Sequence, residues 1–294
     1  MTINSIGVMS PGDMGSGVGG VLAENGFDIW TALEGRSDSS KERAQQQGIK
    51  DAGSLDDLVK KCDLILSIMV PSEAVSFAEE LAASVSRTKT SVYFADCNAV
   101  SPDTGIQIGE IVSKADIKYI DAGIIGGTPR NGAVPKFYAS GPHAHALAEL
   151  DGKGILVPVL DGPIGRASGL KMVYAALTKG VAALYSSTLM TAQSLDLFDD
   201  LIAELEDSQP GTLKGMNGVN TISTRAFRWI GEMYEIAKTF ESAGATPKIH
   251  QGAADTFTEI AESSIGHERN ETIDRTRQLK DTIAAILIDA DGQE

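Results

Sequence analysis

A glycine-containing turn near the start of the chain has residue types and spacing that suit nucleotide binding. An apolar stretch, 3–9, runs into this turn, and a run of small residues, 16–23, follows it. The order predicts a strand, a tight turn and a helix start, an arrangement that seats a dinucleotide pyrophosphate on a helix N-terminus. Glycines let the backbone approach the phosphates, and amide hydrogens attract their charge. We expect cofactor contacts from Ser10, which replaces the usual first glycine, and from Pro11, Gly12, Asp13, Met14 and Gly15.

The elements that would position this turn alternate in pattern through the first half of the chain. Residues 64–70 are apolar nearly throughout, which is typical of a strand between two layers of helices. Residues 54–61 and 74–85 have helical patterns, with Ser54 and Ser72 as candidate N-caps. The alternation predicts a doubly wound, mostly parallel sheet. We expect strands over Ser5–Met9, Phe27–Leu33, Leu64–Val70, Ser91–Asp96, Lys118–Asp121, Lys136–Ser140 and Ile155–Val159.

The pattern changes to helices alone after Gly165. From Leu170 onward, apolar residues recur at spacings of three and four, which predicts one long helix. We expect further helices over Leu197–Leu205, Thr224–Phe240, His250–Ser264 and Thr272–Ile288. The predicted fold is an α/β Rossmann domain over residues 1–162, an interdomain helix over 163–195, and an all-α substrate and dimerisation domain over 196–294.

Composition argues against several classes of function. The 294 residues carry a formal net charge of −15 and lack Lys and Arg clusters, so we expect no nucleic-acid partner. No apolar run approaches the ~20 residues that span a bilayer, and we expect a cytoplasmic protein without a membrane segment. Cys62 and Cys97 lie in apolar runs without metal-ligand spacing, so we predict buried, reduced thiols and no metal site.

Four segments, in this order, resemble parts of one enzyme family. Residues 6–15 are similar to the glycine-rich opening of this family, and residues 63–71 are similar to its strand that leads to a proline beside the cofactor. Residues 121–127 are similar to the family's substrate loop, and residues 165–171 are similar to the segment just before its catalytic lysine. Together they resemble the NAD(P)-dependent β-hydroxyacid dehydrogenase superfamily, which includes 3-hydroxyisobutyrate and 6-phosphogluconate dehydrogenases. Imine reductases are relatives of this superfamily. Residues 225–233 resemble a less-studied branch whose helical domain has no agreed function.

The resemblance implies a nicotinamide cofactor, a small-molecule substrate and a homodimer in which the helical domains pack together. It implies further cofactor contacts at Met69, Val70, Pro71 and Asn98. It implies substrate contacts at Ile125, Gly126, Gly127 and Thr128.

Lys171 is the residue to which the resemblance assigns catalysis, and its chemistry suits hydride transfer. Moving hydride to a carbonyl builds negative charge on oxygen, which an ammonium stabilises and protonates. In the reverse direction the amine accepts the proton. Tyr174 follows one turn later on the predicted helix, where it either donates a proton or hydrogen bond or fills the domain junction.

Two positions depart from the family pattern. The loop serine that contacts the substrate carboxylate is Ile125, and the asparagine one turn after the lysine is Ala175. These changes predict a substrate without a carboxylate at the usual place, or a larger one. They leave open an imine reductase-like enzyme, against which the retained Lys171 counts. They also leave open a non-catalytic NADP(H)-binding sensor or scaffold.

Cofactor choice depends on the end of the second predicted strand. An acidic residue such as Glu34 can bind the ribose 2′-hydroxyl and select NAD. The following Gly35-Arg36-Ser37 aligns with the family triplet that binds the 2′-phosphate of NADP. Arg36 can pair bidentately with a phosphate, and Ser37 adds a donor. We therefore predict NADP, with NAD as the alternative.

Arg225 is the candidate anion-binding residue of the helical half. It either binds an anionic substrate group or pairs with Glu232 and Glu235, and the sequence leaves both open. The leading prediction is an NADP-preferring oxidoreductase that transfers hydride between nicotinamide and a small hydroxy or carbonyl compound. We expect the substrate in the cleft between the carboxyl edge of the sheet and the helical domain.

Overall fold

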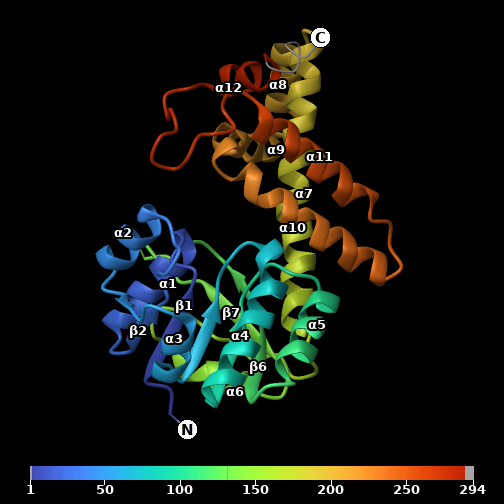
Figure 1. The fold of residues 1–294 in the computed structure, drawn as a ribbon. Helices are drawn as coiled ribbons and strands as arrows, with labels where there is room; N and C mark the ends of the chain where they lie inside the picture. Colours follow the sequence, from blue (N-terminus) through green and yellow to red (C-terminus); the bar gives the residue numbers. More distant parts are fainter. Residues whose placement is uncertain (1, 131, 289–294) are drawn as a thin grey trace. The chain divides into compact units, whose positions relative to one another are not determined.

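A seven-stranded sheet forms the centre of the first half of the chain in the computed structural model, which describes residues 2–130 and 132–288. Its strand order is β3-β2-β1-β4-β5-β6-β7, and every pair is parallel except the antiparallel β6–β7. The order reverses between β1 and β4, which makes this the switch point where doubly wound sheets bind ligands. The strands are β1 (Ser5–Met9), β2 (Asp28–Thr31), β3 (Lys50–Asp51), β4 (Leu64–Ser67), β5 (Val92–Asp96), β6 (Ile117–Ile125) and β7 (Lys136–Ser140) (Figure 1).

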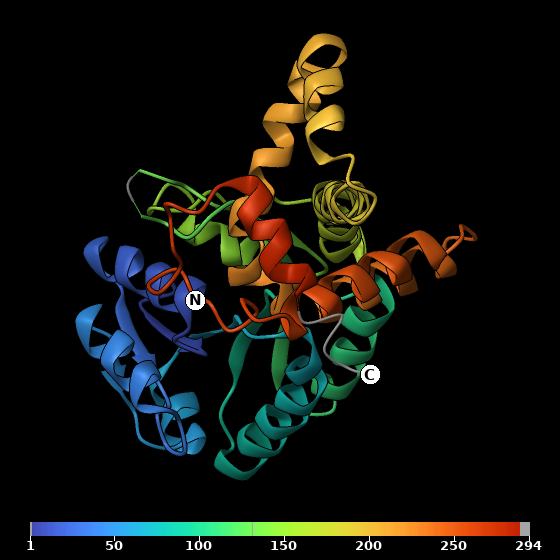
Figure 2. The same ribbon diagram turned by 90° about the horizontal axis from the view of Figure 1, so that it is seen from above.

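Helices cover both faces of this sheet because its central strands are apolar on both sides. In β4, Leu64 and Leu66 join the core beneath α1, whereas Ile65 joins the core beneath α3, α4 and α5. Helices α4 and α5 pack side by side on that second face (Figure 2). The helical elements here are α1 (Asp13–Glu24), α2 (Asp38–Gln46), α3 (Leu55–Lys61), the 3-10 turn η1 (Pro71–Glu73), α4 (Ala74–Thr88), α5 (Pro102–Val112), α6 (Ala144–Leu147) and η2 (Ala148–Leu150).

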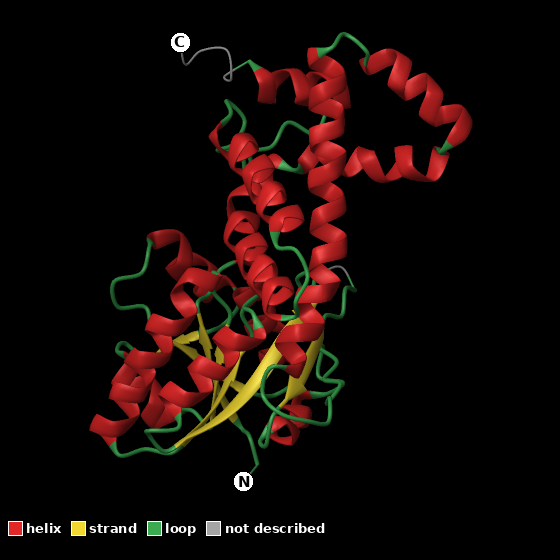
Figure 3. Cartoon of the chain, turned by 90° about the vertical axis from the view of Figure 1, so that its right-hand side faces the viewer, coloured by secondary structure: helices red, strands yellow, loops and turns green. Residues whose placement is uncertain are grey.

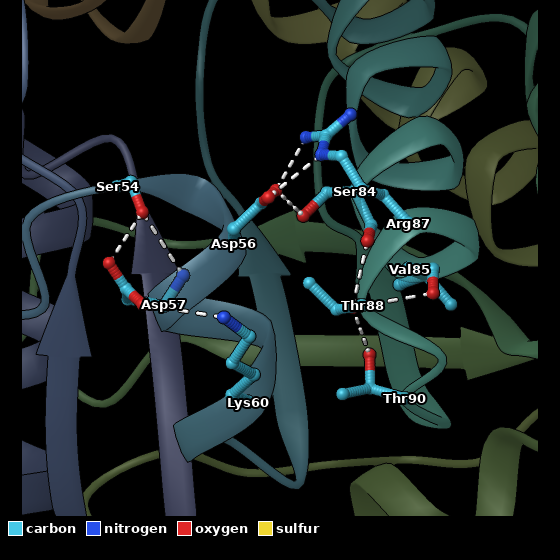
Figure 4. Close-up of polar contacts among 9 residues, drawn as sticks. All are labelled: Ser54, Asp56, Asp57, Lys60, Ser84, Val85, Arg87, Thr88 and Thr90. Carbon is cyan, nitrogen blue, oxygen red and sulfur yellow. Dashed lines mark hydrogen bonds and ion pairs between the residues drawn. The ribbon is translucent and has the colours of Figure 1, made fainter.

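A polar contact on the surface joins α3 to α4. The carboxylate of Asp56 accepts hydrogen bonds from the guanidinium of Arg87 and from the hydroxyl of Ser84 (Figure 4). These hydrogen bonds, with the charge of Arg87, lower the pKa of Asp56 to about 2. On α3 itself, the hydroxyl of Ser54 accepts a hydrogen bond from the backbone N–H of Asp57, which confirms the predicted N-cap.

The sequence predictions for one strand and one helix cap are wrong. Residues 155–159 form isolated bridges instead of a strand, Leu156 and Val159 to β7 and Ile155 to Asp151. Pro158 has no N–H to continue a ladder with β7. The predicted N-cap Ser72 instead lies inside the turn η1, and Glu73 precedes α4 without a side-chain cap.

After residue 165, helices are the only regular elements among the residues that the structure describes, as predicted. The chain divides into two compact units, residues 1–172 and 173–294, and α7 (Arg166–Ser194) contains the dividing point. Within the second unit α10 and α11 pack together (Figure 3). The ring of Trp229 on α10 is edge-on to the ring of Phe257 on α11. Its other elements are α8 (Phe198–Ser208), α9 (Pro210–Met216), η3 (Asn217–Thr221), α10 (Ser223–Ser242), α11 (Lys248–Glu262) and α12 (Leu279–Leu287).

The last predicted helix is correct only in its second part. The sequence predicts a helix over Thr272–Ile288, but α12 begins at Leu279. Upstream, the carboxylate of Asp274 accepts hydrogen bonds from the backbone N–H and the hydroxyl of Thr276, a local turn that competes with helix formation. None of the described helices is long and apolar enough to cross a membrane.

Candidate active site

The carboxyl ends of the parallel strands bring most of the predicted cofactor and substrate residues to one edge of the sheet. The glycine turn follows β1, the Arg36-Ser37 pair follows β2, residues 69–71 follow β4, and Asn98 follows β5. The segment 125–128 begins at the last residue of β6. Because parallel strands end on the same side, these segments share the edge where such sheets bind nucleotides.

The glycine turn has the shape that a pyrophosphate requires. A Cβ atom on Gly15 would lie 2.2 Å from the carbonyl oxygen of Ser10, so only glycine fits there. A Cβ atom on Gly12 would meet nothing within 4 Å, which leaves open space before α1. Gly12 is also the N-cap of α1 and provides no side-chain cap. The first-turn amides of α1 therefore face a position where an anion can bind.

Asp13 places a negative charge at this same helix end, and two partners offset it. Its carboxylate lies 2.9 Å from Nη1 of Arg130 and accepts a hydrogen bond of 2.8 Å from the hydroxyl of Thr128. A Cβ atom on Gly17 would lie 2.4 Å from Cγ2 of Thr128. The loop after β6 thus packs directly on the first turns of α1.

Asp121 fixes the start of α7 to β6. Its buried carboxylate accepts hydrogen bonds from the backbone N–H groups of Gly165 (2.8 Å), Ala167 (3.1 Å) and Ser168 (3.3 Å). The hydroxyl of Ser140 donates to the same oxygen at 2.7 Å, and that of Ser168 donates to the other. An acidic side chain at a helix N-terminus also complements the helix dipole.

Lys171 lies on the second turn of the helix that Asp121 anchors. A Cβ atom on Gly123 of β6 would lie 2.9 Å from Cβ of Lys171 and 3.0 Å from the carbonyl oxygen of Ala167. The glycine therefore allows α7 to pack on the backbone of β6 at the lysine. On the next turn Ala175 is buried and Tyr174 is 47% exposed.

The predicted cofactor-selectivity residues lie between β2 and α2. Arg36 is half-buried. The hydroxyl of Ser37 caps α2 by accepting a hydrogen bond from the backbone N–H of Ser40 at 3.3 Å, and it lies 3.1 Å from the Ser39 hydroxyl. Glu34 is exposed. The start of α2 is therefore rich in hydroxyl groups next to a guanidinium.

Asn98 is buried, and its amide group joins two strand ends. Its oxygen accepts a hydrogen bond from the backbone N–H of Met69 at 2.6 Å, and its nitrogen donates to the hydroxyl of Ser67 at 2.8 Å. These bonds position the segment after β4. The direct cofactor contact of Asn98 stays a prediction.

The second unit holds Arg225, the candidate anion-binding residue. Arg225 and Glu232 form no ion pair, and Nζ of Lys179 lies 2.8 Å from the Glu232 carboxylate instead. In the same unit His250 is buried against the ring of Phe240, with ring centroids 4.3 Å apart, and burial lowers the pKa of His250.

In the first unit both cysteines are free and buried, as predicted, and burial raises the pKa of Cys62 to about 12.

Comparisons with known proteins agree with this architecture. Residues 5–150 match the NAD binding domain of 6-phosphogluconate dehydrogenase, and residues 192–260 match a domain of unknown function, DUF1932. An uncharacterized 28.5 kDa protein of Methanothermus fervidus is 31% identical over 182 residues, which cover 62% of this chain and 68% of that protein. The chain belongs to the β-hydroxyacid dehydrogenase superfamily. This membership places it among NAD(P)-dependent dehydrogenases and reductases.

Solved structures of the superfamily share the fold over nearly the whole chain. One is a conserved protein of unknown function that is described as structurally similar to 3-hydroxyacid dehydrogenases. It is 26% identical with a TM-score of 0.63, and the match covers 88% of this chain and 97% of that protein. The 3-hydroxyisobutyrate dehydrogenase of Mycobacterium tuberculosis is 15% identical with a TM-score of 0.68, and the match covers 97% of this chain and 99% of the dehydrogenase chain. These likenesses confirm the predicted fold class.

The sequence does not predict Arg130, the partner of Asp13. Its chemical signal is indirect: a carboxylate inside a pyrophosphate turn would repel the phosphates unless a cation offset its charge. The loop that carries Arg130 follows β6, 117 residues after Asp13, so nothing in local spacing joins the two.

Proposed function

We propose that this member of the superfamily is an NADP-preferring oxidoreductase that interconverts a small hydroxy compound and its carbonyl form, with Lys171 as proton donor and acceptor. The observation that supports this most strongly is the anchoring of α7 by Asp121. That anchor holds Lys171 against β6, the strand that ends in the loop resembling a substrate loop.

The residues at the switch point fit a dinucleotide. Gly12 and Gly15 supply the close backbone approach, and the first-turn amides of α1 would hold the pyrophosphate. The negative charge of Asp13 does not repel the pyrophosphate at full strength, because Arg130 and the Thr128 hydroxyl contact its carboxylate.

The preference for NADP has support at the start of α2. A 2′-phosphate is an anion that a guanidinium can bind bidentately, and hydroxyl donors strengthen such a site. Arg36 supplies the guanidinium, while Ser37, Ser39 and Ser40 supply hydroxyls at a helix N-terminus. Glu34 would instead favour the 2′-hydroxyl of NAD.

Lys171 would perform the proton transfer of the reaction. A bound nicotinamide supplies hydride to a carbonyl carbon or accepts it from an alcohol. As negative charge develops on the substrate oxygen, the ammonium of Lys171 stabilises that oxygen and gives it a proton. In the oxidative direction the neutral amine of Lys171 takes the hydroxyl proton.

The substrate would differ from a simple hydroxy acid in how it is held. Ile125, at the end of β6, offers no hydrogen bond, and Ala175 is apolar and buried. Gly126 and Gly127 are exposed and would admit substrate close to the backbone. The same apolar positions favour, as a second candidate, an imine reductase-like reaction in which hydride goes to a C=N carbon. They also favour, as a third, an NADP(H)-binding sensor or scaffold without turnover.

The test is a screen of NADPH oxidation across aldehydes, keto acids and cyclic imines, followed by two variants of Lys171. We expect turnover with one carbonyl class. Lys171→Ala and Lys171→Arg should each lower kcat by about 10²–10⁴-fold with NADPH affinity unchanged, because neither side chain can exchange the proton. Lys114→Ala, which removes an exposed lysine after α5, is the matched control.

Each other result names a different function. Turnover confined to cyclic imines would favour the imine reductase-like enzyme. Tight NADPH binding without turnover of any compound would favour the sensor. Full activity in Lys171→Ala would contradict the proposed role of the lysine.

A further inference from the structure

The second unit contains a small pocket of its own, formed by α7, α9, η3 and α10. Its volume is about 210 Å³. Val181, Val219 and Ile222 give it apolar walls, and Tyr185 and Trp229 add aromatic surface. A dry apolar cavity of ~150 Å³ holds a benzene molecule, so this volume suits a ligand slightly larger than benzene.

Arg225 is the cationic residue of this pocket, and its hydrogen bonding is incomplete. Its Nη2 atom donates to the hydroxyl of Thr221 and, at 3.5 Å, to the carbonyl oxygen of Gly218. Its Nε atom is buried and has no hydrogen-bond partner among the described residues. The guanidinium carbon lies 5.3 Å from the ring centroid of Trp229, so the two side chains stack.

A second cation, Lys179, contacts the same tryptophan but differs from Arg225 because it has an acidic partner. Nζ of Lys179 also lies 5.3 Å from the centroid of Trp229, and the carboxylate of Glu232 neutralises it at 2.8 Å. Arg225 forms no ion pair within the described ranges 2–130 and 132–288. Burial lowers the pKa of Arg225, and the nearby charge of Arg228 lowers it further. A cation that is largely removed from water without an anion is costly.

We propose that this pocket binds a small organic acid, with the carboxylate on Arg225 and an apolar body against Val181, Val219 and Ile222. The planar guanidinium matches a carboxylate in a two-point hydrogen bond, and it has further N–H groups besides the Nη2 donor that contacts Thr221. Apolar walls disfavour a fully hydrated inorganic anion. The site is built from residues 178–229 alone and does not depend on hydride transfer, so it goes beyond the proposed function.

Fluorescence titration tests this site, because the chain has two tryptophans. In a Trp30→Phe background, Trp229 is the sole reporter. The probes are acetate, 4-methylpentanoate, 2-oxo-4-methylpentanoate and benzoate, with 4-methylpentanamide as the uncharged isostere and inorganic phosphate as the hydrophilic anion. We expect saturable binding of at least one of the three larger acids. The amide should bind at least roughly tenfold more weakly than 4-methylpentanoate, because it lacks the charge-assisted hydrogen bonds.

Variants locate the binding. Arg225→Gln should weaken binding of the acid by roughly tenfold or more, and Arg228→Gln, which removes an exposed arginine of the same helix, should leave it unchanged. Near-ultraviolet circular dichroism checks that each variant is folded. If Arg225→Gln does not fold, Arg225→Lys keeps the charge and should still weaken binding, since it loses the two-point geometry.

Four results would overturn the proposal. Three of them are no saturable signal with any of the four acids, equal affinity for 4-methylpentanoate and its amide, and a response to phosphate alone. Equal losses of affinity in the Arg225 and Arg228 variants would also overturn it, because a general charge effect would then explain the binding.

Discussion

Asp121 illustrates how single residues position the candidate catalytic group. One of its carboxylate oxygens accepts hydrogen bonds from three backbone N–H groups at the start of α7 and from the hydroxyl of Ser140. The first N–H groups of a helix have no partner within the helix, so this carboxylate satisfies donors that burial would otherwise leave unpaired. Lys171 follows on the next turn. The aspartate is therefore a positioning residue for the lysine.

Replacing Asp121 should affect stability and catalysis together. We expect Asp121→Asn to lower the free energy of unfolding by about 2–4 kcal/mol, because the amide is neutral and its N–H₂ opposes the backbone donors. It should also lower kcat more than it changes KM, because Lys171 loses its fixed position. Urea unfolding and steady-state kinetics measure the two effects. Asp116→Asn, at an exposed aspartate just before β6, is the control. Wild-type stability and kcat in Asp121→Asn would remove the positioning role.

For single residues, the sequence indicates which side chains could bind or react better than it indicates which residues they contact in the folded protein. The Ser10–Gly15 turn and Lys171 are recognisable because residue type and local spacing define them. The sequence predicts Asn98 as a cofactor contact but does not predict that its amide joins the ends of β4 and β5. The pairing of Asp13 with Arg130 depends on a loop that approaches α1 only in the folded protein.

Elements with a strong apolar pattern are the ones that the sequence predicts correctly. β1 has its predicted bounds, and α7 contains the segment from Leu170 onward that has the spacing of three and four, although it begins at Arg166. β3 was not predicted because its two residues, Lys50 and Asp51, are exposed and carry no apolar signal. Residues 155–159 have that signal, but Pro158 limits them to isolated bridges. Helix α9 was not predicted although Pro210 at its first position is a typical start signal.

The contact between α3 and α4 should make stability depend on pH in a defined window. Because the pKa of Asp56 is lowered to about 2 from 3.8, its ionised form is favoured in the folded state. The stabilisation is therefore complete above about pH 4 and is lost as the pH falls through about 2. Thermal unfolding of wild type and Asp56→Asn should differ most above pH 4 and converge near pH 2. A difference in Tm that stays constant over this range would contradict the assignment.

At the scale of the whole molecule, the exposed apolar surface of the helical unit requires an explanation. Leu177, Leu184 and Ile249 are 67%, 62% and 68% exposed and line a groove of about 370 Å³ between α7 and α11. Contiguous exposed apolar surface of this kind marks interaction sites. The family resemblance implies a homodimer, and we propose that the second copy of the chain covers this groove.

The proposed homodimer gives a prediction for the oligomeric state. Leu184→Asp combined with Ile249→Asp should convert the dimer to a monomer, because two buried charges in an apolar interface are costly. Light scattering coupled to size exclusion measures the mass. Ile106→Asp, which changes an exposed apolar residue of α5, should leave the dimer intact. A wild-type monomer, or a dimer that survives both substitutions, would contradict the inferred interface.

We propose that the switch-point turn binds a nicotinamide dinucleotide and that Arg36 makes NADPH the preferred one. The decisive measurement is a pair of titrations with NADPH and NADH, on wild type and on Arg36→Ala. We predict that NADPH binds roughly tenfold or more tightly than NADH and that Arg36→Ala removes the difference, since a charge-assisted phosphate contact is lost. Equal affinity for the two nucleotides in wild type would contradict the preference, and binding of neither would contradict the nucleotide site itself.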